Sequence, residues 1–136
     1  MAGSLKIDIV TPEGLVFSEE ALLVGLPALE GAISVLPHHV HLMTQIVPGE
    51  ITVRASHGDR YLAVGEGLAE ISAHQITVVT DMAIAVDKID EAKAEEARER
   101  AAARLRDKIS DEEVASVNAS LVRSLAQLQV RRRRKV

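Results

Sequence analysis

The stretch Ile76–Ala101, ITVVTDMAIAVDKIDEAKAEEARERA, decides the fold because the sequence changes its periodicity there. Its first residues, Ile76–Thr80, are rich in β-branched side chains and predict a short strand. After about residue 87, apolar residues recur every three or four positions, which is the spacing of one helix face. This apolar stripe consists of Ala94, Ala97, Ala101, Leu105 and Ile109. The switch predicts two domains, a β domain over residues 1–86 and a helical domain over residues 87–136.

The part before the switch reads as several short strands. Apolar and polar residues alternate over residues 5–9 and 51–55, and further β-prone runs cover residues 61–64 and 68–71. Turn-forming residues separate these runs at spacings near ten residues, which predicts an antiparallel β-sandwich or barrel. At Pro48-Gly49 we expect a type II turn, because proline presets φ and glycine accepts a positive φ.

The part after the switch predicts an αα-hairpin. Ser110 opens the sequence SDEE, a capping-box pattern in which Glu113 follows three residues later. A second apolar stripe then contains Val114, Val117, Leu121, Leu125 and Leu128. The first helix would bury mostly alanine, whose methyl group contributes little compared with the entropy of ordering the chain. We therefore expect a marginal hairpin that can leave the β domain, although a firmly docked hairpin remains open.

Composition excludes several functional classes. There is no cysteine, so disulfides, thiolate metal sites and cysteine nucleophiles are absent. Phe17 and Tyr61 are the only aromatic residues, which disfavours a stacking surface for single-stranded nucleic acid. No apolar stretch approaches the roughly 20 residues that span a bilayer, so we expect membrane contact only through a partner. No spacing marks a catalytic group, and we predict no catalytic residues and no enzyme activity for the chain.

Three of the five histidines, His38, His39 and His41, lie close together. In a strand His39 and His41 would share a face, as two metal ligands would. The nearest acids, Glu30 and Glu50, are not at a recognisable ligand spacing, so we predict no metal site.

Charge is divided unevenly along the chain. The net charge is −4, and the acidic residues outnumber the basic ones before residue 87, whereas the basic residues prevail after it. The run Arg131–Lys135 reads RRRRK. It could bind nucleic acid, an anionic membrane or an acidic protein, or simply be a solvated terminus. Because the acidic β domain would repel a phosphate backbone, we do not expect nucleic-acid binding.

Several motifs in order make the chain resemble the epsilon subunit of F-type ATP synthase. The segments that carry the resemblance are Thr11–Ala21 (TPEGLVFSEEA), Leu26–Gly49 (LPALEGAISVLPHHVHLMTQIVPG), Gly65–Ile71 (GEGLAEI), Val78–Ala83 (VVTDMA), Ile89–Ala94 (IDEAKA) and Leu125–Val130 (LAQLQV). The sequence departs from the family pattern at Ala28 and Ser34, where glycine is usual, and at Val40-His41, where Ala-Pro is usual. His39 falls on the histidine of the family motif.

The resemblance implies a ten-stranded β-sandwich followed by a helical hairpin, in a non-catalytic subunit that turns with the rotor. It implies partners in the gamma subunit and the ring of c subunits, and in the alpha and beta subunits of F1. The docking loop for gamma and the c-ring would contain Glu30, Gly31, Ala32, Ile33, Ser34 and His39. Without a visible transit peptide, we expect a peripheral protein on the cytoplasmic face of the bacterial plasma membrane rather than of a plastid thylakoid.

In this family the hairpin regulates the enzyme, and when extended it reaches the beta subunits and blocks ATP hydrolysis. The resemblance assigns this inhibitory contact to basic residues of the second helix, here Arg123, Arg131, Arg132, Arg133 and Arg134. No cofactor is required. The alternative function is a free-standing β-sandwich adaptor whose basic tail binds an anionic partner.

Some family members also bind regulatory ATP on the folded hairpin through a motif that resembles Ile89–Ala94. The residues implied are Ile89, Asp90, Lys93, Ala94, Arg100 and Arg123. Lys93 stands in the place of an arginine and lacks its planar fork of donors, and Gln127 occupies a position where a further arginine would help.

Overall fold

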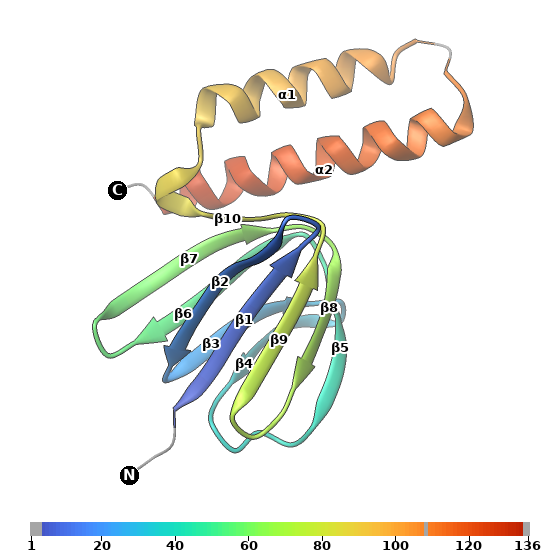
Figure 1. Cartoon of the computed structure of the whole chain (residues 1–136). Coiled ribbons are helices and arrows are strands. Elements are labelled where there is room, and N and C mark those ends of the chain that lie inside the picture. Colours follow the sequence, from blue (N-terminus) through green and yellow to red (C-terminus); the bar gives the residue numbers. More distant parts are fainter. Residues whose placement is uncertain (1–3, 108, 135–136) are drawn as a thin grey trace.

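The computed structural model describes residues 4–107 and 109–134, and in them ten strands precede two α-helices. This confirms the predicted fold class, a β-sandwich followed by an αα-hairpin (Figure 1). The strands are β1 (Leu5–Thr11), β2 (Gly14–Ala21), β3 (Leu23–Ala28), β4 (Gly31–Val35), β5 (Leu42–Ile46), β6 (Gly49–Ala55), β7 (Gly58–Val64), β8 (Gly67–Ile71), β9 (Gln75–Thr80) and β10 (Ala83–Ala85). The helices are the short 3₁₀ helix η1 (Val86–Lys88), α1 (Glu91–Arg104) and α2 (Asp111–Arg133).

The strands form one continuous hydrogen-bonded path that folds into two layers. The order is β10-β7-β6-β3-β5-β8-β9-β1-β2, with β4 paired to the other side of β3. The layers join where Ala28 of β3 pairs with Ile46 of β5. One pair departs from the predicted antiparallel arrangement, because β1 and β9 run parallel. A parallel pair needs a long connection, and here nearly the whole sandwich lies between the two strands.

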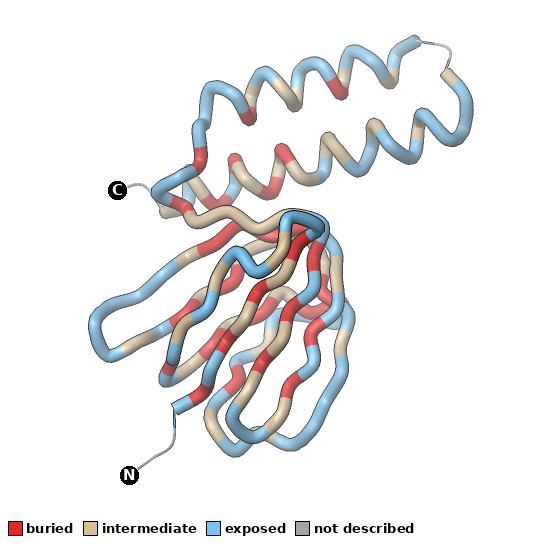
Figure 2. The backbone as a smooth tube through the Cα atoms, in the orientation of Figure 1, coloured by how far each residue is buried: buried red, intermediate tan, exposed pale blue. Residues whose placement is uncertain are grey.

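The core of the sandwich is aliphatic. Inward-facing residues alternate with exposed ones along the strands, as Figure 2 shows and as the sequence predicts for Leu5, Ile7 and Ile9. The main buried cluster contains Leu5, Ile7, Ile9, Ala21, Val24, Leu26, Val35, Ile46, Ile51, Val53, Leu62, Val64, Ala69, Ile71, Ile76 and Val78. β-Branched side chains, which fit a pleated surface and keep few rotamers, make up most of it.

Gly49 and Gly67 both lie where another strand comes close, and at Gly49 this differs from the role that the sequence suggests. The predicted type II turn at Pro48-Gly49 is wrong, because Gly49 begins β6 and does not have a positive φ. A Cβ atom at Gly49 would lie 3.0 Å from the Cβ of Pro27, so the glycine permits close approach of two strands. At Gly67 a Cβ atom would overlap the backbone of Val79 and Thr80.

Both helices begin at capping residues. Asp90 accepts a hydrogen bond from the Lys93 N–H (3.1 Å), and Ser110 accepts one from the Glu113 N–H (3.2 Å). The predicted start of the second helix is therefore confirmed. The predicted apolar stripe of the first helix extends too far, because α1 ends at Arg104 and Ile109 lies in the connection. There the N–H groups of residues 106 and 107 bond three residues back, which tightens the last turn and ends the helix.

The hairpin lies across one end of the sandwich, with α2 between α1 and the strands (Figure 1). Helix α2 contacts α1 along its length and also contacts β6, β7 and η1. Its buried residues, Ser124, Ala126, Leu128 and Val130, all belong to its C-terminal half. The contact with the sandwich is therefore made mainly by the end of the chain.

Candidate functional site

A small apolar cluster lies where α2 contacts the sandwich. Ala63, Val86, Ile89 and Val130 are buried together, and Tyr61, Met82 and Ile84 pack against them. Ala63 belongs to β7, and its strand neighbours Leu62 and Val64 point into the main core. Ala63 therefore faces outward, yet it is fully buried, because α2 covers this face.

An arginine at the end of α2 binds the same face. Glu50 pairs with Ala63 in the β6–β7 ladder, and Thr52 pairs with Tyr61. The Arg134 guanidinium donates from Nε and Nη2 to the two Glu50 carboxylate oxygens, at 3.0 and 2.8 Å. Its central carbon lies 4.0 Å from the centre of the Tyr61 ring, which is a cation–π contact. The hydrogen bonds that Arg134 donates to Glu50 raise the pKa of Arg134 above its ordinary value, so the guanidinium stays charged.

The other polar contacts between α2 and the sandwich are weaker. Arg123 lies 3.4 Å from the Asp81 carboxylate, and both side chains are more than a third exposed. Exposed pairs of this kind contribute little to stability. Gln127 Nε2 lies 3.0 Å from the sulfur of Met82, which is a poor acceptor.

The remaining basic residues of the C-terminal run differ in their surroundings, and Arg133 lines a cavity together with Arg134, Tyr61 and Asp59. Arg132 donates to Glu91 (2.8 Å) and Glu95 (3.0 Å) of α1, and these hydrogen bonds, first to Glu91 and then to Glu95, raise its pKa. Arg131 is half-buried and Arg133 is exposed. The predicted inhibitory residues are thus distributed over three surfaces, and Lys135 lies outside the described residues. Whether they contact a beta subunit remains a prediction.

The predicted docking loop is an exposed turn and strand edge. Leu29 and Glu30 form the β3–β4 turn, and β4 begins at Gly31, whose φ of 133° favours glycine. Ala32 and Ser34 are exposed, while Ile33 packs against the core. A cavity of about 610 Å³ lies between residues 28–33 and 42–45.

Large exposed apolar side chains lie beside this loop and in the β4–β5 connection, and the sequence interpretation did not identify them. Leu29, Leu36, Val40 and Met43 are each more than half exposed. They occupy turns and the edge of β5, where alternation along a strand does not predict burial. Val40, at 74% exposed, lies in the β4–β5 connection, at the end of the sandwich away from the helices (Figure 1). Leu29 and Met43 line the same groove as the predicted docking loop, and exposed apolar side chains around a groove are typical of a protein-binding surface.

The clustered histidines have separate neighbours. His38, which has a φ of 69°, packs edge-on against His74 with ring centres 4.8 Å apart. Nδ1 of His39 lies 2.6 Å from the Val40 carbonyl oxygen, and His41 lies 3.6 Å from Glu70. Within residues 4–107 and 109–134, no group of three or more His, Asp or Glu side chains is placed to hold a metal ion.

The residues expected to bind ATP do not converge on one cavity. Ile89 and Ala94 are buried, and the Asp90 carboxylate caps α1. Arg100 lines a cavity between the two helices, whereas Arg123 lines another one against Pro48 and Asp81. Lys93 is exposed at the start of α1.

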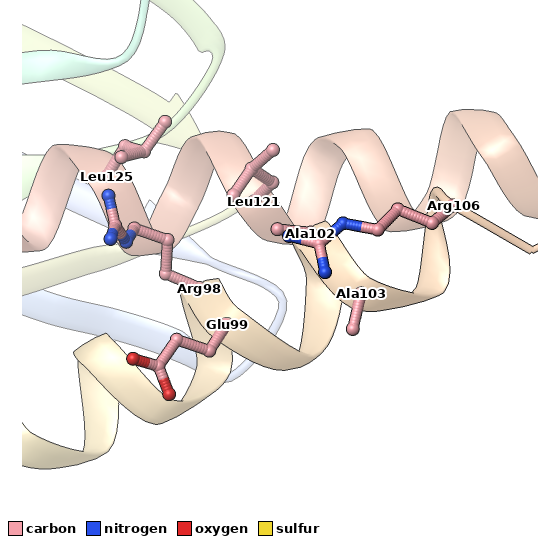
Figure 3. Close-up of a pocket in the computed structure, with 7 residues that line it drawn as sticks. All are labelled: Arg98, Glu99, Ala102, Ala103, Arg106, Leu121 and Leu125. Atoms are coloured by element: carbon pink, nitrogen blue, oxygen red, sulfur yellow. The ribbon is translucent and has the colours of Figure 1, made fainter.

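A further cavity, of about 620 Å³, lies along the seam of the hairpin, which is the interface between α1 and α2 (Figure 3). Its lining residues are Arg98, Glu99, Ala102, Ala103 and Arg106 of α1, and Leu121 and Leu125 of α2. The two leucines face short side chains and are only half-buried. The seam is therefore packed less closely than the core of the sandwich.

In the parts of the chain that the structure describes, neither helix is long and apolar enough to cross a membrane.

Two family models match consecutive parts of the chain. Residues 4–86 match the β-sandwich domain of the ATP synthase delta/epsilon chain, and residues 87–131 match its long α-helix domain. The chain is 38% identical to the ATP synthase epsilon chain of Alkalilimnicola ehrlichii over 127 residues, covering 93% of this chain and 91% of the relative. It is 39% identical to the epsilon chain of Dehalococcoides mccartyi over 132 residues, covering 96% and 94%.

Solved structures support the same fold. A chain of the Euglena gracilis mitochondrial ATP synthase (OSCP/F1/c-ring) matches with a TM-score of 0.67 and 18% identity, covering 97% of this chain and 79% of that one. A chain of the Tetrahymena thermophila mitochondrial ATP synthase (central stalk and c-ring) matches with a TM-score of 0.56 and 8% identity, covering 95% and 94%. The sandwich, the hairpin and the end-to-end likeness to curated epsilon chains together show that the chain belongs to the epsilon-chain family of ATP synthase.

Proposed function

We propose that this epsilon chain couples proton flow to ATP synthesis as a rotor subunit, and that its hairpin inhibits ATP hydrolysis. Family membership makes it a non-catalytic subunit of the complex. One observation carries the inhibitory part. Arg123, Arg132 and Arg134, which would reach a beta subunit, are paired inside the docked hairpin and with the sandwich. Arg123 and Arg134 become available to another subunit when the hairpin leaves the sandwich, and Arg132 when the two helices separate, which is the behaviour of a switch.

The sandwich would dock on the gamma subunit and the c-ring. The loop Glu30–Ser34 and His39 would provide the backbone shape, and the exposed apolar neighbours, Leu29 and Met43 among them, would provide contact area. Such a surface needs shape and apolar area rather than reactive groups. In this proposal the chain is peripheral to the bacterial plasma membrane on its cytoplasmic face, and it meets the membrane only through the complex.

Deleting residues 88–136 tests the inhibitory role. We expect the complex that contains the truncated chain to hydrolyse ATP faster than the wild-type complex, with alpha, beta and gamma still recovered alongside the tagged sandwich. Unchanged hydrolysis in a fully assembled complex would exclude an inhibitory hairpin. As a matched control, the substitution Lys6→Gln removes a charge from β1, far from the hairpin in sequence, and should leave hydrolysis unchanged.

Regulatory ATP is a second part of the proposal, and its only support is the motif Ile89–Ala94. Lys93 would contribute a single charge, with Arg100 or Arg123 as the second cation. Titration calorimetry of the full chain with ATP tests this. Heat that disappears in a Lys93→Gln variant would support binding at the motif, and absence of heat with the wild-type chain would exclude it.

The alternative, a free-standing adaptor with a basic tail, predicts a tail that is free to bind. Two of its arginines are instead paired within the chain. Affinity purification of the tagged chain from its own membranes separates the two functions. Recovery of an ATP-hydrolysing complex would support the rotor subunit, and recovery of the chain alone or with nucleic acid would support the adaptor.

A further inference from the structure

The outer face of the β6–β7 hairpin contains a binding site for one guanidinium group. Glu50 supplies both carboxylate oxygens, and Tyr61, on the neighbouring strand, supplies the ring that the cation covers. A planar fork of donors matches this arrangement, whereas a lysine ammonium would satisfy only one oxygen. In the docked state the Glu50 side chain is 11% exposed and that of Arg134 is 29% exposed, so the pair is shielded from water.

The position of Arg134 links this site to the docking of α2. Its backbone N–H bonds to the Val130 carbonyl oxygen at the end of the helix, so the guanidinium is held one turn from the buried Val130. Two residues earlier, Arg132 points the opposite way and binds α1. Among the described arginines of the run, Arg134 is the one that donates hydrogen bonds to the sandwich.

Because the pair is shielded from water, losing one partner destabilises the docked state by more than the intact pair stabilises it. If Arg134 is lost while α2 stays docked, the Glu50 carboxylate is left covered without this cation, and the Thr52 hydroxyl, at 3.4 Å, is a weak substitute. Leaving a shielded charge without its partner costs more than the intact pair gains. Undocking of α2, which returns Glu50 to water, is the way to relieve that cost.

We propose that Glu50 and Tyr61 form a guanidinium-binding seat for Arg134, and that occupancy of this seat determines how often α2 leaves the sandwich. The basic run is then divided by role. While the hairpin is docked, Arg134 holds it to the sandwich, Arg132 holds the two helices together, and Arg133 lines the cavity beside Arg134. An acidic segment that competes for Arg134 must displace Glu50. The proposal concerns the chain by itself and holds whether or not the extended hairpin inhibits hydrolysis.

The absence of cysteine allows a direct test on the full-length chain. A single Ala63→Cys substitution places a thiol beneath α2, and its rate of reaction with a thiol reagent reports undocking. A single Ala69→Cys substitution places a thiol in the main core, and its rate reports unfolding of the sandwich. Comparing the two rates separates departure of the helix from loss of the fold.

In the Ala63→Cys background, Arg134→Glu and Glu50→Arg should each raise the labelling rate about tenfold or more, as expected for a hydrogen-bonded charged pair. Tyr61→Leu should raise it about threefold, because it removes only the cation–π contact. The double swap Glu50→Arg/Arg134→Glu should restore most of the protection. The control, Arg133→Glu, makes the same charge change at an exposed residue that lines the neighbouring cavity but does not donate a hydrogen bond to Glu50, so it should raise the rate clearly less than Arg134→Glu does.

Two results would overturn the proposal. One is an Arg134→Glu rate equal to that of Arg133→Glu, and the other is a double swap as reactive as the worse single variant. If Glu50→Arg also raises the labelling rate in the Ala69→Cys background, the substitution has destabilised the sandwich itself. The test is then repeated with Glu50→Gln in place of Glu50→Arg. Failure of Glu50→Gln to accelerate labelling in the Ala63→Cys background would count equally against the seat.

Discussion

The sandwich and the hairpin bury different kinds of side chain. The core of the sandwich is filled by isoleucine, valine and leucine, most of them fully buried. Helix α1 buries only Ala94 and Ala101 within its bounds, and its seam with α2 contains a cavity of about 620 Å³. The sandwich thus has a close-packed core of its own, whereas the hairpin depends on contacts at its ends.

This difference indicates how one chain can combine a rigid platform with a movable arm. Burial of large aliphatic side chains contributes about 1.5–3 kcal/mol each, and burial of an alanine methyl group contributes about 0.8 kcal/mol. Local stability follows such contacts, and regions with few of them open first. We expect opening of the hairpin to cost less free energy than unfolding of the sandwich.

The strongest test of the comparison truncates a side chain in each region. Ile76→Ala removes a fully buried side chain whose ladder partners, Ile7 and Ile71, are also buried. It should lower the free energy of unfolding of the sandwich by about 2–5 kcal/mol in urea denaturation. Leu121→Ala removes a half-buried leucine beside the cavity of the seam and should cost about 1 kcal/mol or less, because little packing is lost. Equal losses would mean that the two regions are equally well packed.

A glycine substitution tests the tightness of the sandwich at its β8–β9 contact. A Cβ atom at Gly67 would overlap backbone atoms of Val79 and Thr80, which cannot move as a flexible side chain can. Gly67→Ala should therefore destabilise the sandwich by about 1–3 kcal/mol, measured by the midpoint of urea denaturation. Gly14→Ala is the control, because nothing lies within 4 Å of its Cβ position and only its positive φ opposes the change. A Gly67→Ala variant as stable as Gly14→Ala would show that the strands can shift at little cost.

The sequence predicted the architecture because periodicity and capping are local properties. Alternation in residues 5–9 and the cap at Ser110 were read correctly since each depends on neighbours in the chain. The turn at Pro48-Gly49 was misread because Gly49 is needed against Pro27, a residue of another strand.

The contacts that hold the hairpin were also beyond the sequence interpretation. Glu50 and Arg134 are 84 residues apart, and nothing local marks them as partners. The opposite net charges of the two domains were the available signal, and the basic run was interpreted as a surface for an external partner or a solvated terminus. In the structure these opposite charges also pair within the chain, as Arg134 of the helical domain does with Glu50 of the sandwich.

The smallest expected effect concerns the hairpin alone. Ser110→Ala removes the acceptor for the Glu113 N–H and also loosens the connection, where Arg104 donates to Glu113 at 2.6 Å. Loss of an N-cap costs about 1 kcal/mol, and we expect faster hydrogen exchange in the first turns of α2. Ser116→Ala, on an exposed position of the same helix, keeps the cap and should not accelerate exchange, because alanine favours the helix.

Hydrogen exchange in Ser110→Ala also shows how far along the chain the loss of the cap is felt. The cap is at the end of α2 remote from Val130 and Arg134, so faster exchange should be confined to the connection and the N-terminal half of α2. Exchange in β6 and β7 should be unchanged, because the seat at the other end of the helix still holds. If loss of the cap also released the strands, the hairpin and the sandwich would open as one cooperative unit, and the contrast between platform and arm would be wrong.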